Sequence, residues 1–290
     1  MSVAETISAP TRPALRYHGG KWRLAHWIIS HFPKHRVYCE PYGGAASVLL
    51  RKPRSYSEIY SELDGDICNV FRVLRDPVSA ALLRQQLMLT PYSRLEFEQS
   101  YTPCDDPIES ARRTLVRSYM GFGSAAASAE RTGFRANANR NGTTPAHDWA
   151  NFPDVIPAFT ARLSGVVLEC RDAIEVIKQQ DSPSTLFYVD PPYVHGTRCK
   201  GNIRENKGYR HEMTDDQHCE LASVLRSLDG MVVLSGYQHD LYAELYSDWE
   251  CRRRATHADG ARKRTECLWL SPSVTARLDT QSMFGGHHAD

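Results

Sequence analysis

The segment Val37-Tyr38-Cys39-Glu40-Pro41-Tyr42-Gly43-Gly44 combines an apolar run, an acid and a glycine turn in that order. Val37–Glu40 is predicted as a short strand, and Ala45–Leu50 is predicted to follow as a helix. Such a corner is typical of nucleotide-type binding, because glycine lets the backbone approach a ligand and a helix start offers free N–H groups. Considered alone, however, the same pattern is more often a plain turn between strand and helix.

Strand and helix signals alternate on both sides of this corner. Further strands are predicted at Ile59–Leu63, Val166–Glu169, Leu186–Asp190, Met231–Ser235, Trp249–Ala255 and Thr265–Leu270. This alternation predicts an α/β fold with a parallel sheet. Between residues 76 and 158 the strand signal disappears, and helices are predicted at 78–89, 95–101 and 107–119 before a polar loop at 121–147.

These patterns predict a discontinuous domain of residues 14–75 and 159–274 that is interrupted by a mainly helical insertion of residues 76–158. Residues 1–13 and 275–290 are expected to be flexible tails. A structureless loop as long as the one at 121–147 is usually functional or disordered.

Composition narrows the protein class without naming a ligand. The 290 residues include 35 Lys and Arg against 34 Asp and Glu, so any DNA-binding surface must come from an uneven distribution of charge. The eight cysteines are scattered without zinc-ligand spacing, which predicts reduced thiols. No apolar run approaches the length of a membrane span, so no membrane partner is expected.

The second chemical motif, Asp190-Pro191-Pro192-Tyr193, follows a predicted strand, where ligands of open α/β sheets bind. Pro191 and Pro192 fix the backbone and remove two N–H donors, which leaves a carboxylate, backbone carbonyls and an aromatic ring. The Asp190 carboxylate and the Pro191 carbonyl can accept the two hydrogens of an aromatic amine and free its lone pair for attack on a methyl sulfonium. No metal is expected, because such a methyl transfer needs neither a Lewis acid nor an activated water.

In this interpretation Tyr193 stacks on the base, a contact worth about 1–3 kcal/mol. The base must then be flipped out of the duplex to reach the pocket. The same acceptors would suit any aromatic amine, and a proline-rich turn with a capping aspartate is the alternative for the tetrapeptide alone.

Glu62 lies near the end of the predicted strand Ile59–Leu63, the next one after the Glu40 corner, and is placed like the acid that holds ribose hydroxyls in such folds. Neither G-x-G-x-x-G nor G-x-x-x-x-G-K-[ST] occurs, so the sequence does not indicate a dinucleotide or a triphosphate.

These motifs together resemble those of the Dam-like, alpha-group family of adenine-N6-specific DNA methyltransferases. Tyr17-His18-Gly19-Gly20-Lys21 is similar to the family's G-G-K motif, Glu40–Gly44 to its E-P-F-x-G motif, and Asp190–Tyr193 to its D-P-P-Y motif. The resemblance implies a Rossmann-like methyltransferase sheet, S-adenosylmethionine as cofactor, double-stranded DNA as partner and an insertion that reads the DNA target. It also implies the cytoplasm of a bacterial or phage-infected cell.

The resemblance carries roles to individual positions. Tyr17 and Lys21 are expected near the cofactor and the catalytic pocket. Glu62 would hold the ribose hydroxyls, Asp172 would lie near the cofactor's adenine, and the methionine end would be held by the corner made of Glu40, Pro41, Tyr42, Gly43 and Gly44. Two positions depart from the family pattern, because Tyr42 replaces a Phe and Glu62 stands where Asp is commoner.

Two basic groups are predicted to contact DNA phosphates or guanine edges. They are Arg117, Arg131, Arg135 and Arg140 in the insertion, and Arg198 and Lys200 after the catalytic motif. For any single arginine, a solvated charged face is the simpler explanation. A third basic group, near the C-terminus, could equally contact DNA or form a solvated charged face.

Two other functions fit parts of this pattern. An amino-methyltransferase acting on cytosine N4 or on RNA could use the same acceptor pair. A DNA-binding protein with a silent catalytic domain is the second alternative, although the intact Asp190–Tyr193 motif argues against it.

Overall fold

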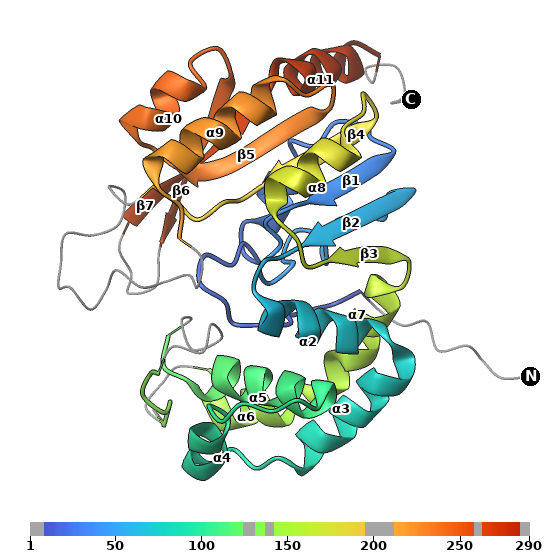
Figure 1. The fold of residues 1–290 in the computed structure, drawn as a ribbon, viewed down its shortest axis with the longest axis vertical. Helices are drawn as coiled ribbons and strands as arrows, with labels where there is room; N and C mark the ends of the chain where they lie inside the picture. Colours follow the sequence, from blue (N-terminus) through green and yellow to red (C-terminus); the bar gives the residue numbers. More distant parts are fainter. Residues whose placement is uncertain (1–8, 124–130, 137–141, 195–211, 258–262, 285–290) are drawn as a thin grey trace, which may run out of the picture. The chain divides into compact units, whose positions relative to one another are not determined.

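The computed structural model describes residues 9–123, 131–136, 142–194, 212–257 and 263–284. Within these residues the sheet has seven strands in the order β3-β2-β1-β4-β5-β7-β6 (Figure 1). They are β1 (Val37–Glu40), β2 (Ser57–Ser61), β3 (Val166–Glu169), β4 (Thr185–Val189), β5 (Met231–Tyr237), β6 (Glu250–His257) and β7 (Lys263–Leu270). β1 is parallel to β2 and β4, β4 is parallel to β5, and β7 is antiparallel to β5 and β6. The predicted α/β fold is confirmed.

The strand order reverses between β1 and β4, which are hydrogen-bonded neighbours. Their register pairs Val37 with Thr185 and Cys39 with Phe187, so both strands end at the same edge of the sheet. Ligands of open α/β sheets bind at this kind of switch point, beyond the carboxyl ends of the strands. Both predicted motifs follow these two strands directly.

The chain divides into two compact units. The first comprises residues 1–23, 44–51 and 64–168 and contains most of the helices between β2 and β3. The second comprises residues 24–43, 52–63 and 169–290 and contains β1, β2 and β4–β7.

Helices α8 (Ala173–Gln180), α9 (Asp215–Arg226) and α10 (Asp240–Leu245) pack on one face of the sheet in the second unit, and Figure 1 shows α8 and α9 in front of the strands. The shared apolar core includes Cys39, Ile59, Phe187, Val189, Val232, Leu234, Cys267 and Trp269 from the strands and Val176, Ile177, Leu221, Leu225 and Tyr242 from the helices. This burial supplies the main driving force for the unit.

The other face of the sheet is rich in tyrosine and acid. Side chains alternate between the faces of a strand, so the residues between the core positions point away from α8 and α9. These buried residues are Tyr38, Glu40, Glu58, Tyr60, Tyr188, Ser235 and Glu266. Phe32 packs near this set, with its ring 5.8 Å from that of Tyr38 and 6.0 Å from that of Tyr188.

Two further helices complete the second unit, α1 (Ala25–Ile29) and α11 (Pro272–Phe284). α11 contacts β5 and β7, and Val274 is fully buried. The prediction of a flexible tail from residue 275 is therefore wrong for residues 275–284, which are helical. The sequence has no apolar stripe there that would have predicted a helix. The helix is held instead by contacts near its start, where Val274 is buried.

The first unit contains α2 (Gly65–Arg75), α3 (Pro77–Leu89), α4 (Arg94–Gln99), α5 (Pro107–Met120), α6 (Pro145–Ala150), the 3₁₀ helix η2 (Pro153–Val155) and α7 (Ile156–Leu163). Capping oxygens start most of these helices by accepting a backbone N–H, and a proline follows the cap in α3, α5 and α6. The caps are Asp64, Asp76, Ser93, Asp106 and Thr144.

α2 packs against α3, α5 and α7, so it belongs to this helical unit by its contacts. The core of the unit includes Leu115 and Val116 of α5, together with Phe152 and Phe159. That the DNA-reading insertion begins at residue 76 stays a prediction.

Two local expectations differ from the structure. Ala45–Leu50 forms a series of turns rather than an α-helix. Gly44 has φ of 47° and Ala46 has φ of 51°, and left-handed residues interrupt a right-handed helix.

Near the N-terminus, Arg12 and Pro13 are packed rather than part of a flexible tail. The Arg12 guanidinium lies 5.3 Å from the centre of the Tyr119 ring, and the Tyr119 hydroxyl donates to the Pro13 carbonyl.

No helix in the described part of the chain combines the length and apolar character needed to cross a membrane.

The buried tyrosines predict a pH dependence of stability. Burial raises the pKa of Tyr38, Tyr188, Tyr193 and Tyr242 well above 10, and nearby carboxylates add to the shift for all four. The neutral hydroxyl is favoured in the folded state, whereas the unfolded chain ionises at about pH 10. Their contribution to stability is therefore complete below pH 10 and is lost as pH rises above it.

Denaturant titrations between pH 8 and about pH 12 should show the free energy of unfolding falling above about pH 10. Tyrosinate absorbance of the buried tyrosines should appear with unfolding, and the urea-unfolded protein is the reference for free ionisation. Complete tyrosine ionisation near pH 10 in a protein that is still folded would contradict this prediction.

Candidate active site

β1 delivers Glu40 to the switch-point edge of the sheet. Its side chain is 2% exposed, and one carboxylate oxygen accepts a hydrogen bond of 2.8 Å from the Tyr38 hydroxyl. Burial first and then the Glu40 charge raise the pKa of Tyr38, so its hydroxyl remains a donor. A buried carboxylate at this place can bind a cationic or hydroxyl group of a ligand.

Gly43 is required by close packing on β2. Its N–H donates to the Ser61 carbonyl at 2.8 Å, and a Cβ built on Gly43 would lie 2.1 Å from Cε2 of Tyr60. Any larger residue would push the turn away from the strand. Pro41, which precedes it, is buried.

Tyr42 is half-buried against the core formed by α8, α9 and α10. Burial is the main cause that raises its pKa, and the nearby carboxylates of Asp172 and Glu220 add to the shift. The hydroxyl that distinguishes Tyr42 from the family's Phe therefore stays neutral and lies among acids.

Glu62 and Asp172 follow neighbouring strands of the same sheet edge. The Glu62 N–H donates to the Glu169 carbonyl at 3.3 Å, and the Ser61 hydroxyl donates to the Arg171 carbonyl at 3.1 Å, so the two loops are joined. Asp172 caps α8 by accepting from the N–H groups of Ile174 and Glu175 at 2.9 and 3.2 Å.

The Asp190–Tyr193 motif follows β4 with a half-buried Asp190, a buried Pro191, a half-buried Pro192 and a Tyr193 that is 6% exposed. The Asp190 carboxylate lies close enough to Tyr188 and Tyr193 to raise the pKa of both tyrosines beyond the effect of burial. Asp190 therefore stands beside the tyrosine-rich face of the sheet, next to the strand that carries Glu40.

Tyr193 is held by two residues that the sequence analysis missed. Its hydroxyl donates to a carboxylate oxygen of Glu266 and lies 3.2 Å from the Ser235 hydroxyl. Its ring packs edge to face on Tyr237, with ring centres 4.5 Å apart. A buried acid within the apolar strand Thr265–Leu270 was the signal that could have identified Glu266.

Tyr17 and Lys21 lie in the helical unit. The Tyr17 ring would be 3.1 Å from a Cβ built on Gly44, which has a positive φ, so these two residues are brought together. Lys21 is 5% exposed and its ammonium donates to the Gly19 carbonyl at 2.8 Å. Their expected roles toward the cofactor stay predictions.

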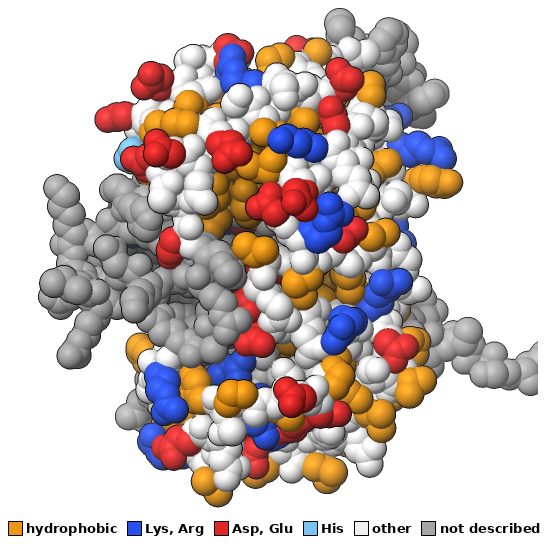
Figure 2. Space-filling view, in the orientation of Figure 1, with side chains coloured by type: hydrophobic (Ala, Val, Ile, Leu, Met, Phe, Trp, Pro, Cys, Tyr) orange, Lys and Arg blue, Asp and Glu red, His pale blue; other side chains and the backbone are white. Residues whose placement is uncertain are grey.

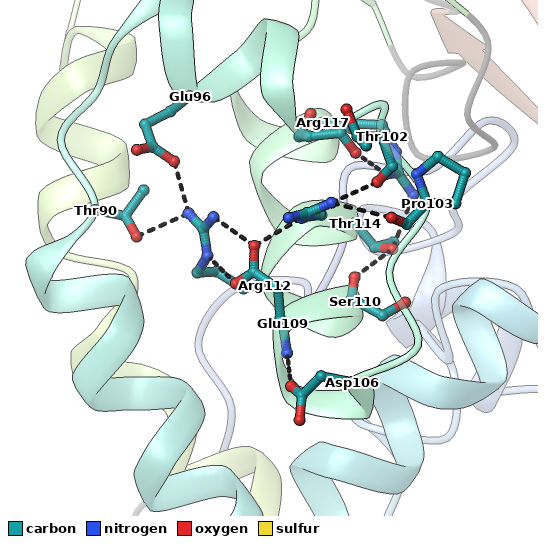
Figure 3. Close-up of polar contacts among 12 residues, drawn as sticks. Thr90, Glu96, Thr102, Pro103, Asp106, Glu109, Ser110, Arg112, Thr114 and Arg117 are labelled. Atoms are coloured by element: carbon teal, nitrogen blue, oxygen red, sulfur yellow. Dashed lines mark hydrogen bonds and ion pairs between the residues drawn. The ribbon is translucent and has the colours of Figure 1, made fainter.

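Arg117, which the sequence predicts to contact DNA, is buried in the helical unit. It is 6% exposed, and its guanidinium donates to the Ser100 carbonyl and the Thr114 hydroxyl. Figure 3 labels Arg117 and Thr114 among the polar contacts of the helical unit. The neighbouring Arg112 lies between Glu96 and Glu109, with contacts of 2.8 and 2.6 Å. These arginines stabilise packed helices because a buried cation needs acceptors on several sides.

Of the other predicted DNA contacts, Arg131 is exposed and its guanidinium lies 5.2 Å from the centre of the Tyr101 ring. Arg135 is half-buried, and its N–H donates to the Met120 carbonyl at 2.7 Å. Arg140, Arg198 and Lys200 lie outside the described residues. Figure 2 shows acidic and basic side chains interspersed on one face of the described residues, rather than separated by sign.

The strand order with an antiparallel β7 is typical of the S-adenosylmethionine-dependent methyltransferase fold, and the acid and glycine corner lies where its ligand site is expected. Within that class, the chain belongs to the family of D12 class N6 adenine-specific DNA methyltransferases, whose family model matches residues 17–259.

Individual relatives agree with the family. The chain is 22% identical to a DNA adenine methylase of Salmonella typhi over 269 residues, which cover 89% of this chain and 94% of the relative. It is 21% identical to the DNA adenine methylase of Escherichia coli strain K12 over 271 residues, with the same coverage. The protein is an S-adenosylmethionine-dependent, adenine-specific DNA methyltransferase. This family membership excludes one alternative that the motifs left open, an amino-methyltransferase acting on cytosine N4 or on RNA.

Gly43→Ala should destabilise the protein by about 1–3 kcal/mol, because the new methyl group overlaps the Tyr60 ring. Thermal unfolding measures the effect. Gly65→Ala is the matched control, since a Cβ there meets no atom within 4 Å and Gly65 begins a helix. Equal melting temperatures for the wild type and Gly43→Ala would contradict the packing described.

Arg117→Met should destabilise the helical unit by about 2 kcal/mol or more, because buried carbonyl and hydroxyl acceptors lose their donor. The slope of log affinity for DNA against log salt should stay unchanged, whereas Arg131→Ala should reduce it by about one if Arg131 contacts a phosphate. A fully stable Arg117→Met protein with a reduced slope would show that Arg117 binds DNA.

Proposed function

We propose that Asp190 and the Pro191 carbonyl accept the two amino hydrogens of an adenine that has been flipped out of double-stranded DNA. The observation that carries this proposal is the place of Asp190 after β4, at the switch point and beside the strand that ends in Glu40. The two acceptors hold the amino nitrogen and localise its lone pair, which positions the nucleophile and stabilises the charge that develops on it.

The residues of the second unit fit S-adenosylmethionine. Close packing at Gly43 leaves a bare backbone turn beside the buried Glu40 carboxylate, which suits the ammonium end of the cofactor. Glu62 offers a carboxylate for ribose hydroxyls, and Asp172 stands at the start of α8 for the adenine end. When bound, the cofactor supplies an electrophilic methyl group on a sulfonium.

Tyr193 would stack on the extruded base. Because its ring is 6% exposed, neighbouring side chains must rearrange when DNA binds. Base extrusion itself is expected because an amino group cannot be reached inside the duplex.

For DNA binding we propose that the insertion, residues 76–158, reads the target and that phosphate contacts come from Arg131, Arg135, Arg140, Arg198 and Lys200. Arg117 is left out of this set because it is buried.

Asp190→Asn should lower the single-turnover methylation rate about 100- to 1,000-fold, because the amide presents one acceptor fewer to the amino group and carries no charge. The affinity for S-adenosylmethionine, measured by calorimetry, should change little. Asp248→Asn is the matched control, since Asp248 is an exposed carboxylate paired with Arg226 at 2.5 Å. Full activity in Asp190→Asn would refute the proposed mechanism.

A further inference from the structure

We propose that Glu266 on β7, together with Ser235 on β5, is a positioning pair that fixes the orientation of the Tyr193 ring before the base arrives. This inference deepens the proposed function and rests on the stacking role of Tyr193. Neither residue is predicted to touch the substrate or the cofactor.

The three side chains form a closed triangle of two hydroxyls and one carboxylate oxygen. The Tyr193 hydroxyl and the Ser235 hydroxyl both bond to Oε1 of Glu266, the second at 2.8 Å. The two hydroxyl oxygens are 3.2 Å apart. Ser235 is 0% exposed and Glu266 is 2% exposed, so water contributes little to holding either one.

The sheet register makes this anchor rigid. Tyr237 of β5 is directly opposite Glu266 of β7, and Ser235 precedes Tyr237 by two residues, so all three share one face. Tyr193 donates to Glu266 while its ring packs edge to face on Tyr237 at 4.5 Å. The loop after β4 is thereby tied at its tyrosine to both β5 and β7.

The chemistry of the triangle suits a permanent anchor rather than a titrating group. Burying a carboxylate is costly unless donors satisfy it, and here two hydroxyls do so. Burial, Asp190 and Glu266 raise the pKa of Tyr193 well above 10, so its hydroxyl remains a donor at working pH. An anchored ring has lost its rotational freedom in advance, which lowers the cost of ordering it against a base.

A positioning role makes predictions that a purely structural acid does not. Tyr193→Phe keeps a stacking ring but removes the anchor, and Glu266→Leu removes the acceptor. Each should lower the single-turnover methylation rate about tenfold, the cost of one lost charged hydrogen bond. Glu266→Gln keeps an acceptor oxygen of the same shape and should stay within about threefold of the wild type.

The decisive measurement is a double-mutant cycle. In a Tyr193→Phe background, Glu266→Leu should cause no further loss of rate, because the interaction is already absent. DNA carrying 2-aminopurine at the target adenine reports stacking by quenching of its fluorescence, and both single variants should be less quenched than the wild type. Affinity for S-adenosylmethionine should be unchanged throughout.

Glu58→Gln is the matched control for loss of a buried acid. Glu58 is 3% exposed, pairs with Lys52 at 2.7 Å and lies near the amino ends of β1 and β2, opposite Tyr38. This variant should be less stable but should keep the wild-type fluorescence and rate once the folded fraction is equal.

Additive losses in the cycle, or a Tyr193→Phe enzyme with wild-type rate and quenching, would overturn the inference. Tyr193→Phe carries the test by itself if Glu266→Leu does not fold. Tyr193→Ala separates this failure from that of the proposed function. Loss of quenching in Tyr193→Ala but not in Tyr193→Phe or Glu266→Leu would reject the positioning pair alone, whereas unchanged quenching in Tyr193→Ala would reject stacking itself.

Discussion

The parallel pairing of β1 with β4 is the constraint on which the site depends. Val37 is paired with Thr185 and Cys39 with Phe187, although these strands are separated by well over a hundred residues. Because parallel strands end at the same edge, this register places the Glu40 corner next to the Asp190–Tyr193 loop. A one-residue slip would reverse the faces of one strand and separate the acid from the catalytic motif.

The two faces of this sheet separate stability from chemistry. The face under α8, α9 and α10 is apolar and supplies the burial that holds the second unit together. The other face carries buried tyrosines and acids. Hydrogen bonds there orient Tyr38 against Glu40 and Tyr193 against Glu266. Buried polar networks of this kind are stable only when their members are satisfied, so positions in them tolerate few changes.

The helical unit shows how packing redirects charged residues. Arg117 belongs to a basic group in the sequence, yet Arg117 and Arg112 bond to Glu96, Glu109, Ser100 and Thr114 inside the unit. A guanidinium presents five donors in a plane, so it can bind acceptors from several helices as readily as it can bind a phosphate. Arg131, by contrast, remains exposed and keeps its proposed role toward DNA.

The sequence by itself determined the α/β class, β1 and β3 to the residue, and the two motifs at the switch point, because apolar runs, glycine turns and prolines act locally. Only the tertiary structure decided the rest. The left-handed Gly44 and Ala46 replaced the expected helix after the corner, and contacts with β5 and β7 ordered α11. Burial made Arg117 structural, and the pairing of β5 with β7 brought Glu266 and Ser235 to Tyr193. These outcomes depend on partners distant in the chain, which no local pattern specifies.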